Sequence, residues 1–278
     1  SIFDEDSLGK LSATAEKMGR SAYIHIPVDT GMGRIGIFPD ETGSEFVRKA
    51  ASYDGIILEG MFTHFAKADE KDPSSADHQL EVFKRFTDDI KANIAPIPIV
   101  HASNSAGIIA VPEANLDMVR AGISLYGLAP SDDVTGFELG LSPVMSVESH
   151  ITYVKRVKKG TTISYGGTFT ADRDMTVATI PLGYADGFPR SLSNKGEVLI
   201  NGKRCRILGR ICMDQFMADV TDAGDVKAGD RVVLLGRYGT EQITAEELGD
   251  LSGRFNYELV CLLNARLPHI YKKSAKAP

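Results

Sequence analysis

Two short polar segments carry side chains whose types and spacing suit an anionic ligand. In DTGMGR, residues 29–34, the glycines permit a tight turn and Arg34 supplies a forked cation for a carboxylate or phenolate oxygen. His64 directly follows the apolar stretch of residues 55–63, which we expect to form a strand. Its ring should therefore lie at the carboxyl edge of the sheet, beside any ligand bound at that edge. A surface arginine in a turn and a histidine that only satisfies hydrogen bonds are the structural alternatives.

Two further segments combine hydroxyl groups, glycine and a cation. HASNSAG, residues 101–107, brings Asn104 and Ser105 to the start of a predicted helix, where free backbone amides bind anions, although helix capping accounts for the same residues. VRAGISLYG, residues 119–127, places Arg120 beside Gly122, where the backbone can approach a ligand closely. Together with Ser105 this is typical of a phosphate site in a barrel, while an arginine paired with a carboxylate is the alternative.

Tyr165 and the cysteines complete the candidate residues. Tyr165 precedes two glycines in a β-rich segment, which indicates a bend that presents a phenol, or else a tyrosine at the edge of a core. A phenol acts as a base only where cations or hydrogen bonds favour the phenolate.

Cys205, Cys212 and Cys261 are widely spaced in apolar sequence, so we expect reduced, mostly buried thiols and no metal site.

The elements that position these residues change in kind near residue 140. Helical spacing predicts helices near residues 8–18, 41–51, 76–91 and 106–110, and apolar stretches predict strands over 21–28, 55–64, 97–103 and 116–122. This alternation predicts an α/β region with ligands at the carboxyl ends of its strands. Beyond residue 140 we expect a mostly β domain, with a hairpin at Asn201-Gly202 and a strand in GDRVVLLG. Four βα units are half of an eight-stranded barrel, and a half barrel would leave long hydrophobic strand edges exposed. We therefore expect either an open sheet or a segment preceding Ser1.

Charge and hydropathy limit the partners. The formal net charge is −6, with acids and bases interspersed, so there is no basic stripe for nucleic acid or for a membrane surface. No apolar run approaches the roughly 20 residues of a membrane helix, and we expect a cytoplasmic protein.

The polar segments, taken in order, resemble the signature segments of one family. VDTGMGRIG, THFAKAD, HASNSAG, VRAGISLYGL, ISYGGTF, PLGYADGFPR, GRICMDQ and NYELVCLLNARLPHIY are similar to successive segments of alanine racemase, across essentially the whole chain. The resemblance implies pyridoxal 5'-phosphate as cofactor and interconversion of L-alanine and D-alanine for peptidoglycan. It also implies a homodimer in which residues 1–140 are the second half of a (β/α)₈ barrel. Residues 141–278 would then form a C-terminal β domain that contributes to the active site of the other subunit.

The same resemblance gives each candidate a role. Arg120 resembles the arginine that hydrogen-bonds the pyridine nitrogen of the cofactor. Tyr165 resembles the base on the L-alanine side, acting across the dimer interface, and His64 resembles the imidazole that hydrogen-bonds this phenol. The phosphate-binding set would be Ser105, Gly122, Ile123 and Tyr257, supported by Asn104, and the substrate-binding set would be Arg34, Met213 and Tyr184. Arg34 would also belong to the catalytic set with Tyr165 and His64, because it resembles the arginine near the 3-oxygen of the cofactor and the substrate carboxylate.

Two positions depart from the family pattern. The family's Schiff-base lysine lies upstream of every residue present here, and Lys67 has no place in the pattern that would make it a substitute. Matching the segments backward predicts that the first four βα units have been lost, with Ser1 just after the fourth strand, and that a separate N-terminal fragment could carry the lysine. Pro27 stands where many members have a lysine, often carbamylated, whose charge positions the loop arginine. We therefore expect another acceptor near Arg34.

Three other interpretations remain open. The chain could be a catalytically inactive racemase fragment that lacks the lysine, or a binding-only half barrel for a sugar or nucleotide phosphate. It could also be a serine racemase of the same family. Tyr257 favours alanine, because a phenol beside the substrate methyl leaves little room for a larger side chain.

Overall fold

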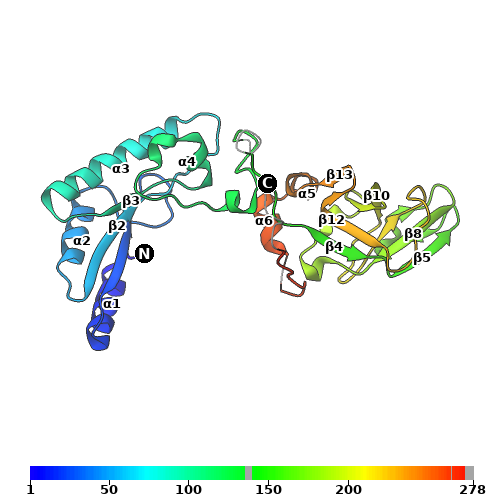
Figure 1. Cartoon of the computed structure of the whole chain (residues 1–278), viewed down its shortest axis with the longest axis horizontal. Helices are drawn as coiled ribbons and strands as arrows, with labels where there is room; N and C mark the ends of the chain where they lie inside the picture. The colour runs from blue at the N-terminus through cyan, green and yellow to red at the C-terminus, as the bar shows by residue number, and fades with distance from the viewer. Residues whose placement is uncertain (135–139, 264, 273–278) are drawn as a thin grey trace. The chain divides into compact units, whose positions relative to one another are not determined.

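The computed structural model describes residues 1–134, 140–263 and 265–272 (Figure 1). The chain divides into two compact units, Ser1–Ser142 and Pro143–Pro278, called here the N-terminal and C-terminal units. The first combines helices with a parallel sheet and the second is mostly β, which confirms the predicted fold class at this level. None of the helices in the described ranges is long and apolar enough to cross a membrane.

The N-terminal unit has a three-stranded parallel sheet in the order β1-β2-β3. Two of its helices, α1 and α2, begin where an acidic side chain caps free N–H groups: Asp4 accepts from the amide of Ser7, and Asp40 from that of Gly43. Their apolar faces and the strands enclose one core, which includes the fully buried Ile26, Met61 and Phe83. The main elements are α1 (Glu5–Met18), β1 (Ala22–Pro27), α2 (Glu41–Ala51), β2 (Ile56–Phe62), α3 (Ser74–Asn93), β3 (Ile99–His101) and α4 (Ser105–Ala110). Two 3₁₀ turns follow, η1 (Pro112–Ala114) and η2 (Ile123–Tyr126).

The strand predicted over residues 116–122 was wrong. The backbone of Asp117 donates to the carbonyl of Val100, and that of Arg120 donates to the carbonyl of Ser103, so the segment runs beside β3. The Asp117 carboxylate accepts the N–H of Val100 at 2.8 Å. The Asp117 side chain therefore takes the place of the backbone carbonyl that a regular fourth strand would offer to Val100. As a result, the segment of residues 116–122 forms no regular β-ladder with β3.

The C-terminal unit is built around an antiparallel sheet in the order β13-β12-β9-β10-β11-β8-β5, with β4 also pairing with β12. A small second sheet joins β6 and β7. The strands are β4 (Val147–His150), β5 (Tyr153–Val157), β6 (Thr162–Ile163), β7 (Phe169–Thr170), β8 (Met175–Ile180), β9 (Glu197–Ile200), β10 (Lys203–Leu208), β11 (Phe216–Asp219), β12 (Arg231–Tyr238) and β13 (Glu241–Ile243). The helical segments are η4 (Tyr165–Gly167), η5 (Tyr184–Asp186), η6 (Arg190–Leu192), α5 (Ala245–Ser252) and α6 (Asn256–Leu262).

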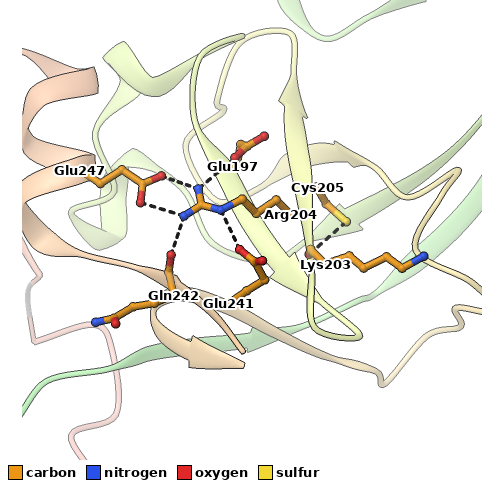
Figure 2. A network of polar contacts seen from close by, with 7 residues as sticks. All are labelled: Glu197, Lys203, Arg204, Cys205, Glu241, Gln242 and Glu247. Atoms are coloured by element: carbon orange, nitrogen blue, oxygen red, sulfur yellow. Dashed lines mark hydrogen bonds and ion pairs between the residues drawn. The ribbon is translucent and has the colours of Figure 1, made fainter. Parts of the chain in front are cut away.

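The predicted hairpin joins β9 and β10 through Asn201 and Gly202, which have φ values of 51° and 72°. Two successive positive φ angles match the turn type that fits the twist of paired strands. From β10, the guanidinium of Arg204 reaches the carboxylates of Glu197, Glu241 and Glu247 (Figure 2). One cation therefore ties β9, β10, β13 and α5 together.

The cysteines are free thiols. Cys205 is buried, and burial, with the nearby Asp219 and Glu197, raises the pKa of its thiol to about 12. Cys212 is half-buried and Cys261 is exposed, so the expectation of mostly buried cysteines was wrong for Cys261. Within the described residues there is no cluster of three or more His, Cys, Asp or Glu that could hold a metal ion.

Candidate active site

The loop after β1 is shaped by Asp29. Its carboxylate accepts the amides of Gly31 and Gly33, both at 3.0 Å, and this closes the turn predicted for DTGMGR. Arg34, which follows, lines a small hollow together with Pro27 and His64. Arg34 is exposed, and within the described ranges no residue accepts a hydrogen bond from it. The expected substitute acceptor is thus not among the described residues of this chain.

Gln79, which the sequence did not single out, fixes the two loops at the ends of β1 and β2. Its side chain is 3 % exposed and lies on α3. Its Nε2 donates to the hydroxyl of Thr30 at 3.1 Å and to the carbonyl of His64 at 3.0 Å. Its Oε1 accepts the amide of Ala66 at 2.9 Å. Two of these contacts hold the backbone at His64 and Ala66, and the third holds the Thr30 side chain in the loop that carries Arg34.

The imidazole of His64 lies near two cations. Its Nδ1 is 3.4 Å from a terminal nitrogen of Arg120. Burial, followed by the charges of Arg120 and Arg34, lowers the pKa of His64 below its usual value. Since arginine only donates, Nδ1 is the acceptor and Nε2 carries the proton of the neutral ring. His64 can therefore donate a hydrogen bond from Nε2.

The guanidinium of Arg120 donates hydrogen bonds to three further protein acceptors. Its NH1 donates to Nδ1 of His101 at 2.6 Å, and its NH2 donates to the carbonyls of Thr63 and Ala102 at 2.7 and 3.0 Å. The guanidinium carbon lies 5.2 Å from the centre of the Phe62 ring. In the described part of the chain no carboxylate pairs with Arg120 and Nε has no partner. Burial and the charge of Arg34 lower the pKa of Arg120. Because the acceptors lie at NH1 and NH2, the Nε–H stays available for a ligand.

Hydroxyl and amide groups meet between the start of α4 and the segment that follows Arg120 in the chain. Ser105 Oγ accepts the amide of Gly122 at 2.8 Å and lies 3.1 Å from the hydroxyl of Ser124. The amide of Ile123, which begins η2, has no acceptor among the described residues. Asn104 caps α4 by accepting the amide of Gly107 at 2.9 Å, as the capping interpretation predicts. The free amide and the hydroxyls suit a phosphate group.

Tyr165 lies on a strained turn of the C-terminal unit. Ser164, just before it, has φ of 67°, and its hydroxyl donates to the carbonyl of Arg210. Tyr165 itself is 69 % exposed and lines a wide open hollow that also includes Met213. A serine held in the left-handed region next to an exposed phenol is the kind of local strain found at functional sites.

Backbone hydrogen bonds bring Tyr184 and Met213 together. The amide of Tyr184 donates to the carbonyl of Cys212 at 3.1 Å, and the next amide donates to the carbonyl of Met213 at 3.0 Å. Gly183 permits this contact, because a Cβ there would lie 2.2 Å from the Met213 oxygen. Tyr257, on α6, is half-buried and stacks on Phe255 with ring centres 4.5 Å apart.

The candidates thus form two sets. The N-terminal unit gathers Arg34, His64, Arg120, Ser105, Asn104, Gly122 and Ile123, and the C-terminal unit carries Tyr165, Tyr184, Met213 and Tyr257. The predicted contact between His64 and Tyr165 joins residues of different units and stays a prediction. The sequence analysis missed His25 and Glu59 as well as Gln79, since a single polar residue in an apolar strand gives no signal of its partners.

Comparisons with known proteins agree over nearly all of the chain. Residues 1–130 match the family described as alanine racemase, N-terminal domain, and residues 144–271 match alanine racemase, C-terminal domain. An alanine racemase of Methanococcus maripaludis is 46 % identical over 270 residues, which cover 97 % of this chain and 72 % of that protein. One from Halothermothrix orenii is 47 % identical, with 96 % and 70 % covered.

Solved structures of the same enzyme are similar as well. Alanine racemase of Clostridium difficile 630 has a TM-score of 0.90 at 41 % identity, covering 95 % of this chain and 68 % of its own. The Bacillus anthracis enzyme with bound L-Ala-P has a TM-score of 0.90 at 35 % identity, covering 99 % and 71 %. From both family matches and these relatives, the chain belongs to the alanine racemase family.

Proposed function

We propose that this chain provides the cofactor and substrate sites of an alanine racemase that interconverts L-alanine and D-alanine. The observation that carries the proposal is the arrangement around Arg120. Protein acceptors occupy both terminal nitrogens, while its Nε–H and the Ile123 amide have no partner in the described ranges. A fixed cation, followed three residues later by a free amide that lies near hydroxyls, suits a ring nitrogen and a phosphate on one ligand.

Pyridoxal phosphate fits these donors. Ser105, Gly122, Ile123 and Tyr257 would hold its phosphate, and Arg120 would donate from Nε to its ring nitrogen. When bound, the cofactor supplies a conjugated ring that takes up electron density from the substrate α-carbon. Arginine does not release its proton, so Arg120 would keep the ring nitrogen unprotonated and limit side reactions.

Tyr165 and His64 would move the proton on the L-alanine side. The phenol oxygen of Tyr165 takes the α-proton, and the Nε2–H of His64 donates a hydrogen bond to that oxygen. This hydrogen bond favours the phenolate. As in the family, the phenol would come from a second copy of the chain, in a homodimer whose C-terminal β domain, residues 141–278, completes the site of residues 1–140.

The remaining candidates would orient the amino acid. Arg34 and the amide of Met213 bind its carboxylate, and Tyr184 lies beside them on the substrate side. Tyr257 limits the space near the substrate methyl, which favours alanine over serine. Positioning of this kind keeps the α-hydrogen within reach of the base.

A second candidate function concerns a polypeptide of residues 1–278 by itself. The chain covers 72 % and 70 % of the two curated relatives, and the family resemblance assigns the base on the D-alanine side to a lysine outside residues 1–278. We therefore propose that the polypeptide of residues 1–278 holds half of a (β/α)₈ barrel. On its own it exchanges the α-hydrogen of L-alanine without forming D-alanine, and a fragment carrying the lysine restores racemisation.

Titration with pyridoxal phosphate tests the cofactor site directly. We expect Arg120→Met to raise the dissociation constant roughly ten- to hundredfold, because it removes a charged donor worth about 1.5–3 kcal/mol. Arg85→Met, at an exposed position of α3, is the matched control and should leave the constant unchanged. Equal affinity of the Arg120→Met variant and the unaltered chain would contradict the proposed site.

A further inference from the structure

Four side chains of the N-terminal unit form a continuous row of hydrogen bonds that ends at Arg120. Glu59 Oε2 lies 3.0 Å from Nε2 of His25, and Nδ1 of His25 lies 2.8 Å from Nε2 of His101. Nδ1 of His101 lies 2.6 Å from NH1 of Arg120. The row therefore connects a carboxylate on β2 with the guanidinium at the proposed cofactor site through two imidazoles.

The chemistry of the two ends fixes every proton in this row. Arginine can only donate, so Nδ1 of His101 accepts and its proton sits on Nε2. Nδ1 of His25 must then accept from His101, which places the proton of His25 on Nε2 facing Glu59. The carboxylate accepts this last hydrogen bond. Burial, Arg120 and His25 lower the pKa of His101 to about 4, which agrees with a neutral ring.

The strands are shaped to allow this contact. Ile24 of β1 pairs with Leu58 of β2, but the next residue, His25, pairs with Gly60, so Glu59 is an extra residue in a bulge. A Cβ at Gly60 would lie 2.6 Å from the His25 ring. The bulge and the glycine together leave room for the imidazole and give Glu59 a place outside the regular pairing.

We propose that Glu59 and His25 are positioning residues for Arg120. From the other end of the row they support the Nε2–H tautomer that Arg120 imposes on His101, so that its Nδ1 holds NH1 of Arg120 and leaves Nε free for a ligand. Phe62 supports the same arrangement, since its ring stacks on His101 with centres 5.0 Å apart and also faces Arg120. The tautomers rest on this chain alone, and only the effect on the cofactor rests on the proposed function.

Side-chain ¹H–¹⁵N correlation spectra of the full chain without cofactor test the proton positions. We expect His25 and His101 both to be neutral and protonated on Nε2 at pH 7.5. Glu59→Gln keeps an acceptor oxygen and should keep both tautomers. Glu59→Met removes the acceptor and should give mixed tautomers, while Glu81→Met, at an exposed position of α3, should change neither ring. A charged or Nδ1-protonated His101 in the unaltered chain overturns the proposal, whether or not any variant folds.

Titration of the same variants with pyridoxal phosphate tests the consequence. Glu59→Met should bind roughly two- to tenfold more weakly, the ratio that one hydrogen bond supplies, and Glu59→Gln should bind nearly as well as the unaltered chain. Unchanged affinity in Glu59→Met overturns the positioning role. If no protein binds the cofactor while the tautomers are as expected, the hydrogen-bonded row stands and the proposed function fails.

Discussion

Gln79 donates a hydrogen bond from its buried amide to the backbone carbonyl of His64 at 3.0 Å. The same nitrogen donates to Thr30, whose hydroxyl lies 2.6 Å from that of Thr63. Loops that follow two different strands are thus joined through one side chain of α3. The positions of Arg34 and His64 depend on a residue that touches neither of their side chains.

Gln79→Met should loosen both loops. The substitution keeps the volume but leaves the amide of Ala66 and the carbonyl of His64 without partners, at a cost of about 1–3 kcal/mol in the free energy of unfolding. Hydrogen exchange of the Ala66 amide should become faster. Glu81→Met on the same helix serves as control, and equal exchange rates in both variants would contradict the role of Gln79.

Gly183→Ala should separate Tyr184 from Met213. The added Cβ would lie 2.2 Å from the Met213 oxygen and 2.4 Å from that of Cys212, so the backbone must move. We expect a loss of about 3 kcal/mol in chemical denaturation. Gly224→Ala meets no atom within 4 Å and should cost only about 1 kcal/mol, from its φ of 83°. Similar losses in both variants would show that the close contact does not matter.

The unfolding free energy should fall with acid because of His101. The folded state lowers the pKa of this ring from 6.5 to about 4, so the native protein binds fewer protons than the unfolded chain between these values. The contribution of His101 to the free energy of unfolding is therefore fully present above about pH 6.5. It is lost progressively toward pH 4, by about 1–3 kcal/mol for this group. His101→Gln should flatten the decline measured by urea denaturation, and His78→Gln, at an exposed position, should not. The same slope in all three proteins would refute the assignment.

Arg204→Met should destabilise the C-terminal unit by about 1–2 kcal/mol, because three carboxylates lose their shared cation. Arg204 is partly exposed, so salt screens the network and the loss should shrink in 1 M NaCl. Lys203→Met, one residue earlier, is the control for adding a methionine to β10. A loss that is the same at low and high salt would indicate a packing effect instead.

Local chemistry determines which elements could be predicted from the sequence. Helix α2 was predicted with its observed bounds, because Asp40 supplies a cap and the apolar spacing is regular. The hairpin at Asn201-Gly202 was predicted for a similar reason, since two residues determine the turn. The prediction of a strand over 116–122 was wrong because the Asp117 side chain accepts a hydrogen bond from the backbone of β3. The periodicity of the sequence does not reveal such a contact.

Only the site residues that lie in a recognisable sequence motif could be predicted. The sequence indicated Arg34, His64, Arg120 and Ser105 through their segments, and the structure places them in one unit. Glu59 and His25 were missed because their contact depends on a bulge between parallel strands. Gly60 is the one marker of this bulge in the sequence, and a glycine within a strand is equally typical of a sharp bend or a close backbone approach.

Proton exchange on alanine in D₂O is the most direct test of the proposed chemistry. With pyridoxal phosphate added, residues 1–278 should replace the α-hydrogen of L-alanine by deuterium with retention, leave that of D-alanine in place, and form no D-alanine. Tyr165→Phe should abolish the exchange and Tyr153→Phe, at another exposed tyrosine, should not. Exchange that persists in Tyr165→Phe, or that occurs equally on both enantiomers, would contradict the assignment of Tyr165 as the base on the L-alanine side.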